Sequence, residues 1–291
     1  MEISICLCYN KNKQFNKLEY LKKWWDNMKS ELKRALLKKL NFVLIIVVVG
    51  LMIINAYYGG WKTALRADSA QDLLNIEDVI FFKKYYGNMY RVWKDSYYMV
   101  QALAPVILAA PYLNTYLLEK TNRFRFFCVS RKGNLKYVCQ KAFAIALSGT
   151  IVLAFSELLL AVLTGLLTQH DTSIEFIQGI VSFKEDFFID NPMLYFVLIY
   201  VSHIVYYFCF LIFATGITSF LKNKIAVIVA PFIIASALDM ILPTALQPNV
   251  VMQPYRGTFC IGGYGVLIGI YVITGVILLM ISEKIYQKRG N

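Results

Sequence analysis

Charged side chains are scarce in this chain of 291 residues. Asp, Glu, Lys and Arg together make up only 16% of it, whereas 58% of the residues are hydrophobic, and the mean hydropathy is positive. Ordinary soluble domains contain about 25% charged residues. The composition therefore excludes a typical soluble domain of this length and indicates an integral membrane protein.

Histidines and the common catalytic motifs are also lacking. The chain contains only His170 and His203, and it has no G-x-x-x-x-G-K-[ST] phosphate loop, no H-E-x-x-H zinc pair and no G-x-S-x-G nucleophile elbow. Cys6 and Cys8 form a C-x-C pair, but no nearby histidine or second cysteine pair accompanies it, so we expect no metal site there. We therefore expect no catalysis by this chain alone and no cofactor bound to it.

Long apolar runs are what the sequence has in abundance. A helix needs roughly 20 apolar residues to cross about 30 Å of hydrocarbon. The first run has no small-residue cleavage site and is predicted to be a retained span, and the fifth contains Pro231 and Pro243 and is predicted to be kinked. The six runs that meet this length lie at about residues 41–58, 98–118, 142–168, 193–220, 225–246 and 261–282. The predicted fold class is an all-α integral membrane protein with six transmembrane helices.

Basic residues are distributed unequally between alternate connections. On one side of the predicted membrane there are 22 Lys and Arg, in the leader, the connections 119–141 and 221–224, and the tail. On the other side there are 8, in the connections 59–97, 169–192 and 243–260. Because positive connections remain in the cytoplasm, both termini are predicted to be cytoplasmic. The net charge of +12 is spread between apolar segments, so we expect no nucleic-acid partner. The predicted parts are a leader (1–40), a six-helix domain (41–282) and a tail (283–291).

The leader carries an amphipathic pattern. Apolar residues recur at spacings of three and four between Leu18 and Ala35, and lysines occupy the other sides. This pattern predicts a helix in the headgroup layer, with tryptophans at interface depth and lysines facing anionic lipid. Contact with lipid alone, or with a cytoplasmic partner as well, would give the same pattern. The candidate interfacial residues are Lys22, Trp24, Trp25 and Lys29.

The connection after the second predicted span reads LLEKTNRFRFFCVSRKGNLKYVCQKA. With the six-span topology, it resembles the membrane subunit of a type-2 ATP-binding cassette exporter. In that family a Glu leads into a short coupling helix, and a Ser-Arg pair precedes a Tyr and a Lys that open the third span. Val129 stands where the family usually has Pro, and the gap from Arg to Tyr is longer than usual. By resemblance, these roles fall to Glu119, residues 122–129, Ser130, Arg131, Tyr137 and Lys141.

The resemblance implies a partner for this basic connection. Two copies of the chain would pair with two copies of a separate cytoplasmic ATPase, which would bind ATP and Mg. The positive-inside rule is an alternative explanation for the charge, but it does not explain three phenylalanines in a cytoplasmic connection. Arginines can hold such a joint with directional hydrogen bonds. The candidate coupling residues are Glu119, Arg123, Phe124, Arg125, Phe126, Phe127 and Arg131.

Polar groups inside the predicted spans are candidates for a substrate path. A carboxyl midway through a span, such as that of Glu157, costs about 2.5 kcal/mol or more unless it faces water or a partner. An interhelical hydrogen bond is the alternative role for it. Aromatic residues in the fourth span either pack helices or line a path wall. The candidates are Glu157, Tyr200, His203, Tyr207 and Asp239. They would suit an amphipathic cargo, such as a lipid-like molecule or an antimicrobial or toxin peptide.

Two connections on the other side complete the prediction. Residues 59–97 are expected to form short surface helices or a cap. Residues 243–260 contain three prolines and are expected to form a re-entrant segment or an ordinary proline-rich loop. Gly265 and Gly269 form a small-xxx-small face, to which we assign no dimer.

The expected function is peptide or lipid export across a bacterial plasma membrane. The alternatives are a secondary transporter or an intramembrane enzyme without an ATPase partner.

Overall fold

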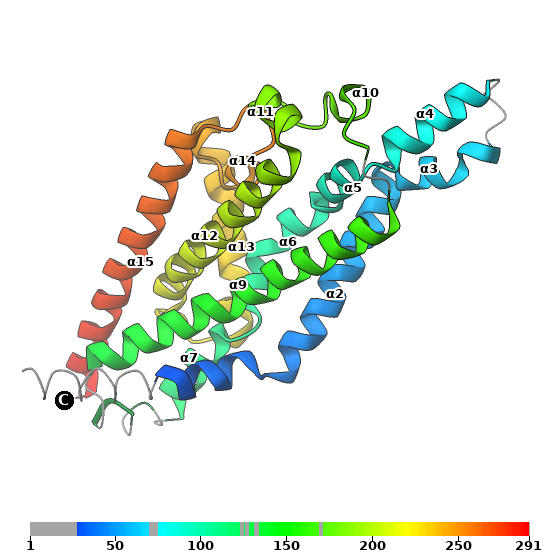
Figure 1. The fold of residues 1–291 in the computed structure, drawn as a ribbon. Helices are drawn as coiled ribbons and strands as arrows, with labels where there is room; N and C mark the ends of the chain where they lie inside the picture. The colour runs from blue at the N-terminus through cyan, green and yellow to red at the C-terminus, as the bar shows by residue number, and fades with distance from the viewer. Residues whose placement is uncertain are drawn as a thin grey trace, which may run out of the picture.

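A computed structural model describes residues 28–69, 75–122, 125, 128–130, 134–168 and 171–290. These residues form helices joined by short turns, and they contain no β-strand. Figure 1 shows them as an elongated bundle. Residues 28–36 are helical. The named elements that follow are α2 (Lys39–Ala56), η1 (Tyr57–Trp61), α3 (Lys62–Arg66), η2 (Ala67–Ser69), α4 (Ile76–Tyr86), α5 (Met89–Ser96), α6 (Tyr98–Ala109), α7 (Leu113–Thr121), α9 (Asn134–Leu167), α10 (Ile174–Ile177), α11 (Glu185–Asp190), α12 (Pro192–Thr218), α13 (Lys224–Ile241), η3 (Thr244–Leu246), α14 (Pro248–Val251) and α15 (Ile261–Gly290).

Six helical stretches of the described residues are long and apolar enough to cross a membrane. They confirm the prediction of an all-helical chain with six such stretches, as in a multi-pass membrane protein. Their apolar side chains also point outward: Ile46 is 71% exposed, Leu166 78% and Met240 86%. Such surfaces suit hydrocarbon rather than water. The six stretches are Lys39–Ser69, Tyr98–Thr121, Asn134–Leu167, Pro192–Thr218, Lys224–Ile241 and Ile261–Gln287.

The first stretch extends beyond the predicted end at residue 58. A π-helical turn, η1, joins α2 to α3 and contains Gly59 and Gly60. Gly60 has a φ of 154°, and a β-carbon there would lie 2.8 Å from the ring of Tyr86. Glycine has no β-carbon and can adopt this backbone conformation. The helix therefore continues through a kink toward the 59–97 connection.

The second stretch is interrupted, which the apolar pattern did not predict. α6 ends at Ala109 and α7 begins at Leu113, with Pro111 between them. Proline lacks the amide hydrogen that a helix needs and crowds the preceding turn. The ammonium of Lys38 donates a hydrogen bond to the carbonyl oxygen of Pro111 at 3.2 Å and to the hydroxyl of Thr115 at 3.3 Å. A side chain from outside the span thus satisfies part of the interrupted backbone.

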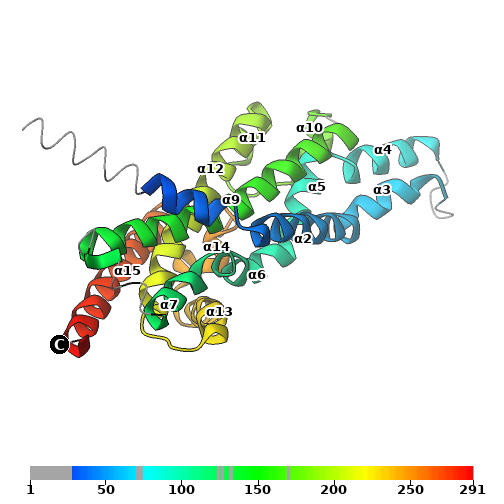
Figure 2. The same cartoon turned by 90° about the horizontal axis from the view of Figure 1, so that it is seen from below.

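Helix α12 lies at the centre of the bundle. It packs mainly against α15 on one side and α9 on the other, and α9 also packs against α2. Figure 2 shows α13 beside α7 and α6, away from α9. The core is rich in aromatic residues, and the tyrosines at positions 97, 206, 207 and 271 are buried. The aromatic side chains of the fourth span therefore serve at least in helix packing.

Helix α13 ends earlier than the predicted boundary at residue 246. Pro231 lies within the helix, but the chain becomes extended at Leu242, and Pro243 follows. The next residues form η3 and α14 and return to the bundle, where Met252, Gln253 and Tyr255 are buried. The middle of the predicted 243–260 segment is therefore packed against the helices of the bundle.

Short helices cover one end of the bundle. Lys84 in α4 pairs with Asp171 at 3.0 Å, Asn88 donates to the carbonyl oxygen of Asp171 at 2.7 Å, and Lys94 donates to that of Ile180 at 3.0 Å. Hydrogen bonds from Ser173, together with the charge of Lys84, lower the pKa of Asp171 to about 2. The 59–97 connection is thus attached to the segment after α9.

The opposite end gathers different elements. Helix 28–36, α7, the start of α9 and the end of α15 lie together at the bottom of Figure 1, whereas α4, α5, α10 and α11 lie at the top. The charge distribution predicts that the lower end is cytoplasmic. The predicted coupling residue Glu119 lies in α7, at this same end.

Candidate functional site

A cluster of charged side chains, two of them buried, joins four segments at the lower end of the bundle. The segments are helix 28–36, the break between α6 and α7, α7 itself and the start of α9. Lys141 is 1% exposed and Glu119 is 6% exposed, which is rare for such side chains unless they are paired. We call this group the basal cluster; it consists of Glu31, Arg34, Tyr112, Glu119, Tyr137 and Lys141.

Lys141 is the centre of the basal cluster. Its ammonium lies 2.6 Å from a carboxylate oxygen of Glu31 and 2.8 Å from one of Glu119. Tyr137 donates to the other oxygen of Glu119 at 2.6 Å, and Tyr112 donates to Glu31 at 2.7 Å. The two carboxylates therefore share one buried cation and two phenolic donors. This arrangement holds α7, α9 and helix 28–36 in one geometry.

The basal cluster also keeps Glu31 ionised. Burial alone would raise the pKa of Glu31, but the charge of Lys141 and the hydrogen bonds from Lys141 and Tyr112 outweigh it, so the pKa is lowered. Arg34, 3.4 Å from Glu31 and 3.9 Å from Glu119, adds a second positive charge. Helix 28–36 is thus attached to the bundle by ion pairs that persist at neutral pH.

A second buried ion pair lies beside the basal cluster. Arg125 comes from the connection between α7 and α9, and its guanidinium forms a hydrogen-bonded ion pair with Glu283 near the end of α15. Tyr116 donates to the other oxygen of Glu283 at 2.8 Å, and Asn134 accepts from Arg125 at 3.1 Å. The guanidinium also lies 4.0 Å from the ring centre of Tyr286. The connection is therefore fixed to α15 as well as to α9.

The predicted coupling residues fall into two groups. Glu119 and Arg125 lie at this end of the bundle, one in each of the two ion-pair groups. Tyr137 and Lys141, which the resemblance placed at the start of the third span, lie in the basal cluster with Glu119. The remaining candidates lie outside the described residues, and they are Arg123, Phe124, Phe126, Phe127 and Arg131. Of the interfacial candidates, Lys29 is exposed, and Lys22, Trp24 and Trp25 lie outside the described residues.

Sequence reasoning missed two carboxylates of this end. Glu31 lies in the leader helix, where the alternation of apolar and charged residues predicted contact with lipid headgroups and gave no sign of a buried ion pair. Glu283 is the only acid in the last nine residues of the chain, and an isolated acid at the end of an apolar helix could have suggested a buried partner. That partner, Arg125, is 158 positions away in the sequence.

The substrate-path candidates Glu157 and His203 form a pair inside the bundle. The imidazole Nδ1 of His203 lies 3.0 Å from a carboxylate oxygen of Glu157, and its Nε2 lies 3.2 Å from the carbonyl oxygen of Met252. Glu157 is 0% exposed and His203 1%. Gln101 donates to the same carbonyl oxygen of Met252 at 2.9 Å. The pair therefore links α9 and α12 to the residue that follows α14.

The other path candidates lie at separate positions. The phenolic oxygens of Tyr207 and Tyr97 are 3.2 Å apart in the core, and Tyr200 donates to the carbonyl oxygen of Ala154 at 3.1 Å. Asp239 accepts from the backbone amide of Asn249 at 2.8 Å. It thus binds the start of α14 rather than Glu157 or His203.

Two cavities lie next to these candidates. One, of about 530 Å³, is lined by Glu157 and Tyr200 together with Tyr90, Trp93 and Phe196. The other, of about 640 Å³, is lined by Asp239 together with residues of α6, α12, α13 and α14. Glu157 and Tyr200 therefore border one cavity of the chain, and Asp239 borders another.

Within the described parts of the chain, no three His, Cys, Asp or Glu side chains come together in a way that could hold a metal ion. Comparisons with protein-family models, with curated proteins and with solved structures find no match.

Proposed function

We propose that this chain is the membrane subunit of an ATP-driven exporter of the type-2 ATP-binding cassette class, located in a bacterial plasma membrane. Two copies would work with two copies of a separate ATPase that binds ATP and Mg. The observation that carries the proposal is the pair of buried ionic joints at one end of the bundle. The pair of Arg125 and Glu283 attaches the connection between α7 and α9, in which the resemblance places the coupling helix, to α15, and the pair of Glu119 and Lys141 joins the two helices that flank the connection.

The mechanism uses these joints as mechanical links. Closure of the ATPase dimer on ATP would push the connection. The ion pair between Arg125 and Glu283 would pass the displacement to α15, and that between Glu119 and Lys141 would keep α7 and α9 moving together. Buried charge pairs hold geometry well because separating them leaves an uncompensated charge. The helices would then switch between inward-open and outward-open or collapsed arrangements.

The cargo we propose is amphipathic, either a peptide or a lipid-like molecule. The cavity beside Glu157 supports this choice because it combines a carboxylate with tyrosine, tryptophan and phenylalanine side chains. Aromatic faces and a carboxylate attract cationic and apolar groups together. The cavity lies between α5, α9 and α12.

One observation favours the alternative of a secondary transporter. The pair of Glu157 and His203 is an ionisable couple within the helical bundle, and such groups commonly carry protons in transporters. An exporter depends on its ATPase, whereas a secondary transporter depends on an ion gradient. Identifying a partner therefore distinguishes the two.

The first test is to purify the detergent-solubilised chain from its native host and to measure ATP hydrolysis by the complex in vesicles. We expect a protein with a phosphate-loop motif to copurify. We expect the wild-type chain to raise the rate of ATP hydrolysis above that of the ATPase alone. Arg125→Glu should lower the rate to that of the ATPase alone, because breaking a buried ion pair costs about 3–5 kcal/mol. The double substitution Arg125→Glu with Glu283→Arg should restore much of the stimulation.

Lys284→Ala provides the matched control, since it removes an exposed positive charge next to Glu283 and should leave stimulation unchanged. If no ATPase copurifies, the exporter proposal is wrong and a gradient-driven transporter is favoured. If the ATPase is present but Arg125→Glu stimulates it fully, the ionic joint is not part of the coupling.

A further inference from the structure

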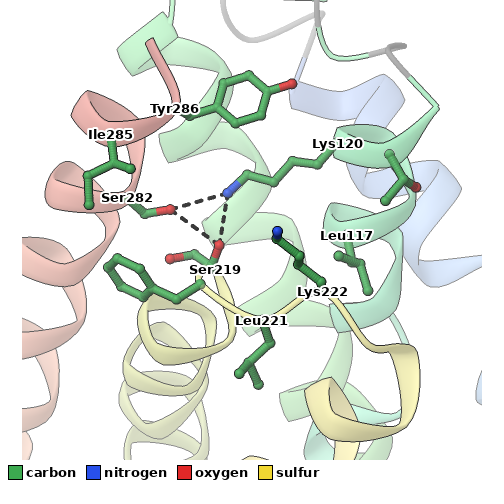
Figure 3. Close-up of a pocket in the computed structure, with 10 residues that line it drawn as sticks. Leu117, Lys120, Ser219, Leu221, Lys222, Ser282, Ile285 and Tyr286 are labelled. Atoms are coloured by element: carbon green, nitrogen blue, oxygen red, sulfur yellow. Dashed lines mark hydrogen bonds between the residues drawn. The ribbon is translucent and has the colours of Figure 1, made fainter. Parts of the chain in front are cut away.

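A cavity of about 510 Å³ lies where several membrane-length helices end. Figure 3 shows it between the end of α7, the turn after α12 and the end of α15. The span Tyr98–Thr121 ends here, as do Pro192–Thr218 and Ile261–Gln287, and Lys224–Ile241 begins nearby. In a bilayer, such a position corresponds to the headgroup level. The lining residues are Leu117, Lys120, Thr121, Ser219, Phe220, Leu221, Lys222, Ser282, Ile285 and Tyr286.

The lining is positively charged. It includes two lysines, four hydroxyl side chains and no carboxylate. The side chains of Lys120 and Lys222 extend into the space between α7 and α15 from different elements (Figure 3). The neighbouring acid, Glu283, is engaged by Arg125 and Tyr116. An anion in this cavity would therefore meet two cations without a nearby opposing charge on the lining.

Lys120 is held in position before any ligand binds. Its ammonium donates to the carbonyl oxygen of Ser219 at 2.9 Å and to the hydroxyl of Ser282 at 3.2 Å. It also lies 4.9 Å from the ring centre of Tyr116 and 5.6 Å from that of Tyr286. An ammonium has three donors, so one N–H remains for an anion. The preorganised lysine reduces the entropic cost of binding.

The apolar residues beside the cavity indicate what is attached to the anion. Phe220 and Ile285 on its rim are 44% and 40% exposed. Ile285 continues a row at a spacing of four along α15 with Ile281 and Ile277, which are 43% and 50% exposed. Residues four apart share one face of a helix. An acyl chain lying on this row would place its headgroup in the cavity.

We propose that this cavity binds the phosphate of an anionic phospholipid, with Lys120 and Lys222 contacting the headgroup and an acyl chain lying along α15. Basic pockets between helices at the membrane surface bind anionic headgroups in this manner. A free phosphate ion offers the same charge but gains nothing from the isoleucine row. The inference does not depend on the exporter proposal, because the site is formed by a single chain.

The test uses the purified full-length chain and native mass spectrometry to measure retained phosphatidylglycerol relative to phosphatidylcholine. At about 1 kcal/mol per lysine, Lys222→Ala should weaken phosphatidylglycerol retention about fivefold and Lys120→Ala with Lys222→Ala about 30-fold. Phosphatidylcholine retention should not change. Lys284→Ala, an exposed lysine on α15 that does not line the cavity, is the control and should bind as the wild type does.

A competition arm separates the two sources of phosphate. Excess inorganic phosphate should leave the lipid in place, because the ion lacks an acyl chain. If phosphate displaces the lipid, the site binds the ion and the lipid proposal is overturned. Equal retention by Lys222→Ala and the wild type would overturn it as well, and this exposed substitution leaves the contacts of Lys120 intact.

Discussion

At the residue scale, the hydrogen bonds of His203 restrict how protons are placed inside the bundle. A carbonyl oxygen only accepts, so Nε2 must donate to Met252, and Nδ1 faces the carboxyl of Glu157. A hydrogen bond between Nδ1 and the carboxyl needs one further proton, carried either by the ring, as an imidazolium with a carboxylate, or by the carboxyl, as a carboxylic acid with a neutral ring. Both arrangements carry no net charge, which a buried, low-dielectric site tolerates.

This pairing predicts coupling between the two residues. Glu157→Ala and His203→Ala should each destabilise the protein, and the double variant should lose less than the sum of the two. The expected coupling is about 0.6–1.7 kcal/mol, as for other hydrogen bonds between membrane helices. Glu157→Gln should lose less than Glu157→Ala because the amide can donate to Nδ1. Unfolding in detergent measures all four free energies.

The control for this cycle is Leu158→Ala, which truncates a neighbouring side chain that is 45% exposed. It should not interact energetically with His203→Ala. Additive losses for Glu157→Ala and His203→Ala would contradict the pairing.

At the scale of elements, the apolar runs predicted the six long helices because hydrocarbon leaves the backbone few alternatives to a helix. Their ends were less predictable. Pro111 interrupts the second run although its neighbours are apolar, and α9 begins at Asn134, eight positions before the predicted 142. Hydropathy measures only how readily a side chain is transferred from water into hydrocarbon. It carries no information about the hydrogen bonds by which Lys38 stabilises the break between α6 and α7.

Helix packing illustrates another limit of the sequence. The small-residue face of Gly265 and Gly269 was noticed, but β-carbons added at these positions would meet nothing within 4 Å. The close contact between α15 and α12 is instead at Gly275, where a β-carbon would lie 2.8 Å from the backbone of Ile212 and Phe213. A glycine spacing is common in membrane helices, and only the partner helix decides which glycine is used.

We therefore expect two glycine substitutions in α15 to differ. Gly275→Ala should lower the free energy of unfolding by about 1–3 kcal/mol, because the added methyl group meets backbone that cannot move aside easily. Gly269→Ala is the matched control and should be within about 0.5 kcal/mol of the wild type. Thermal unfolding in detergent measures both. Equal stability of the two variants would show that α12 and α15 do not approach as closely as Gly275 requires.

At the scale of the whole molecule, the candidate sites combine residues that are distant in the sequence. Glu157 and His203 were each recognised as candidates, but nothing in their spans fixed how the two helices are rotated toward each other. Arg125 was recognised without Glu283, and Glu119 and Lys141 without Glu31. Composition and spacing thus indicated which residues matter, and the packing of the bundle decided which of them meet.

The distribution of charge over the molecule supports the last prediction, that the basal cluster faces the cytoplasm. Cys260 and Thr121 are both exposed and lie near opposite ends of the bundle. In intact cells, a membrane-impermeant maleimide should label a variant whose only cysteine is Cys260. It should label a variant whose only cysteine is introduced by Thr121→Cys only after permeabilisation, because segments rich in Lys and Arg remain inside. Labelling of the introduced cysteine in intact cells would place the basal cluster outside, where no cytoplasmic ATPase could reach the connection that Arg125 anchors.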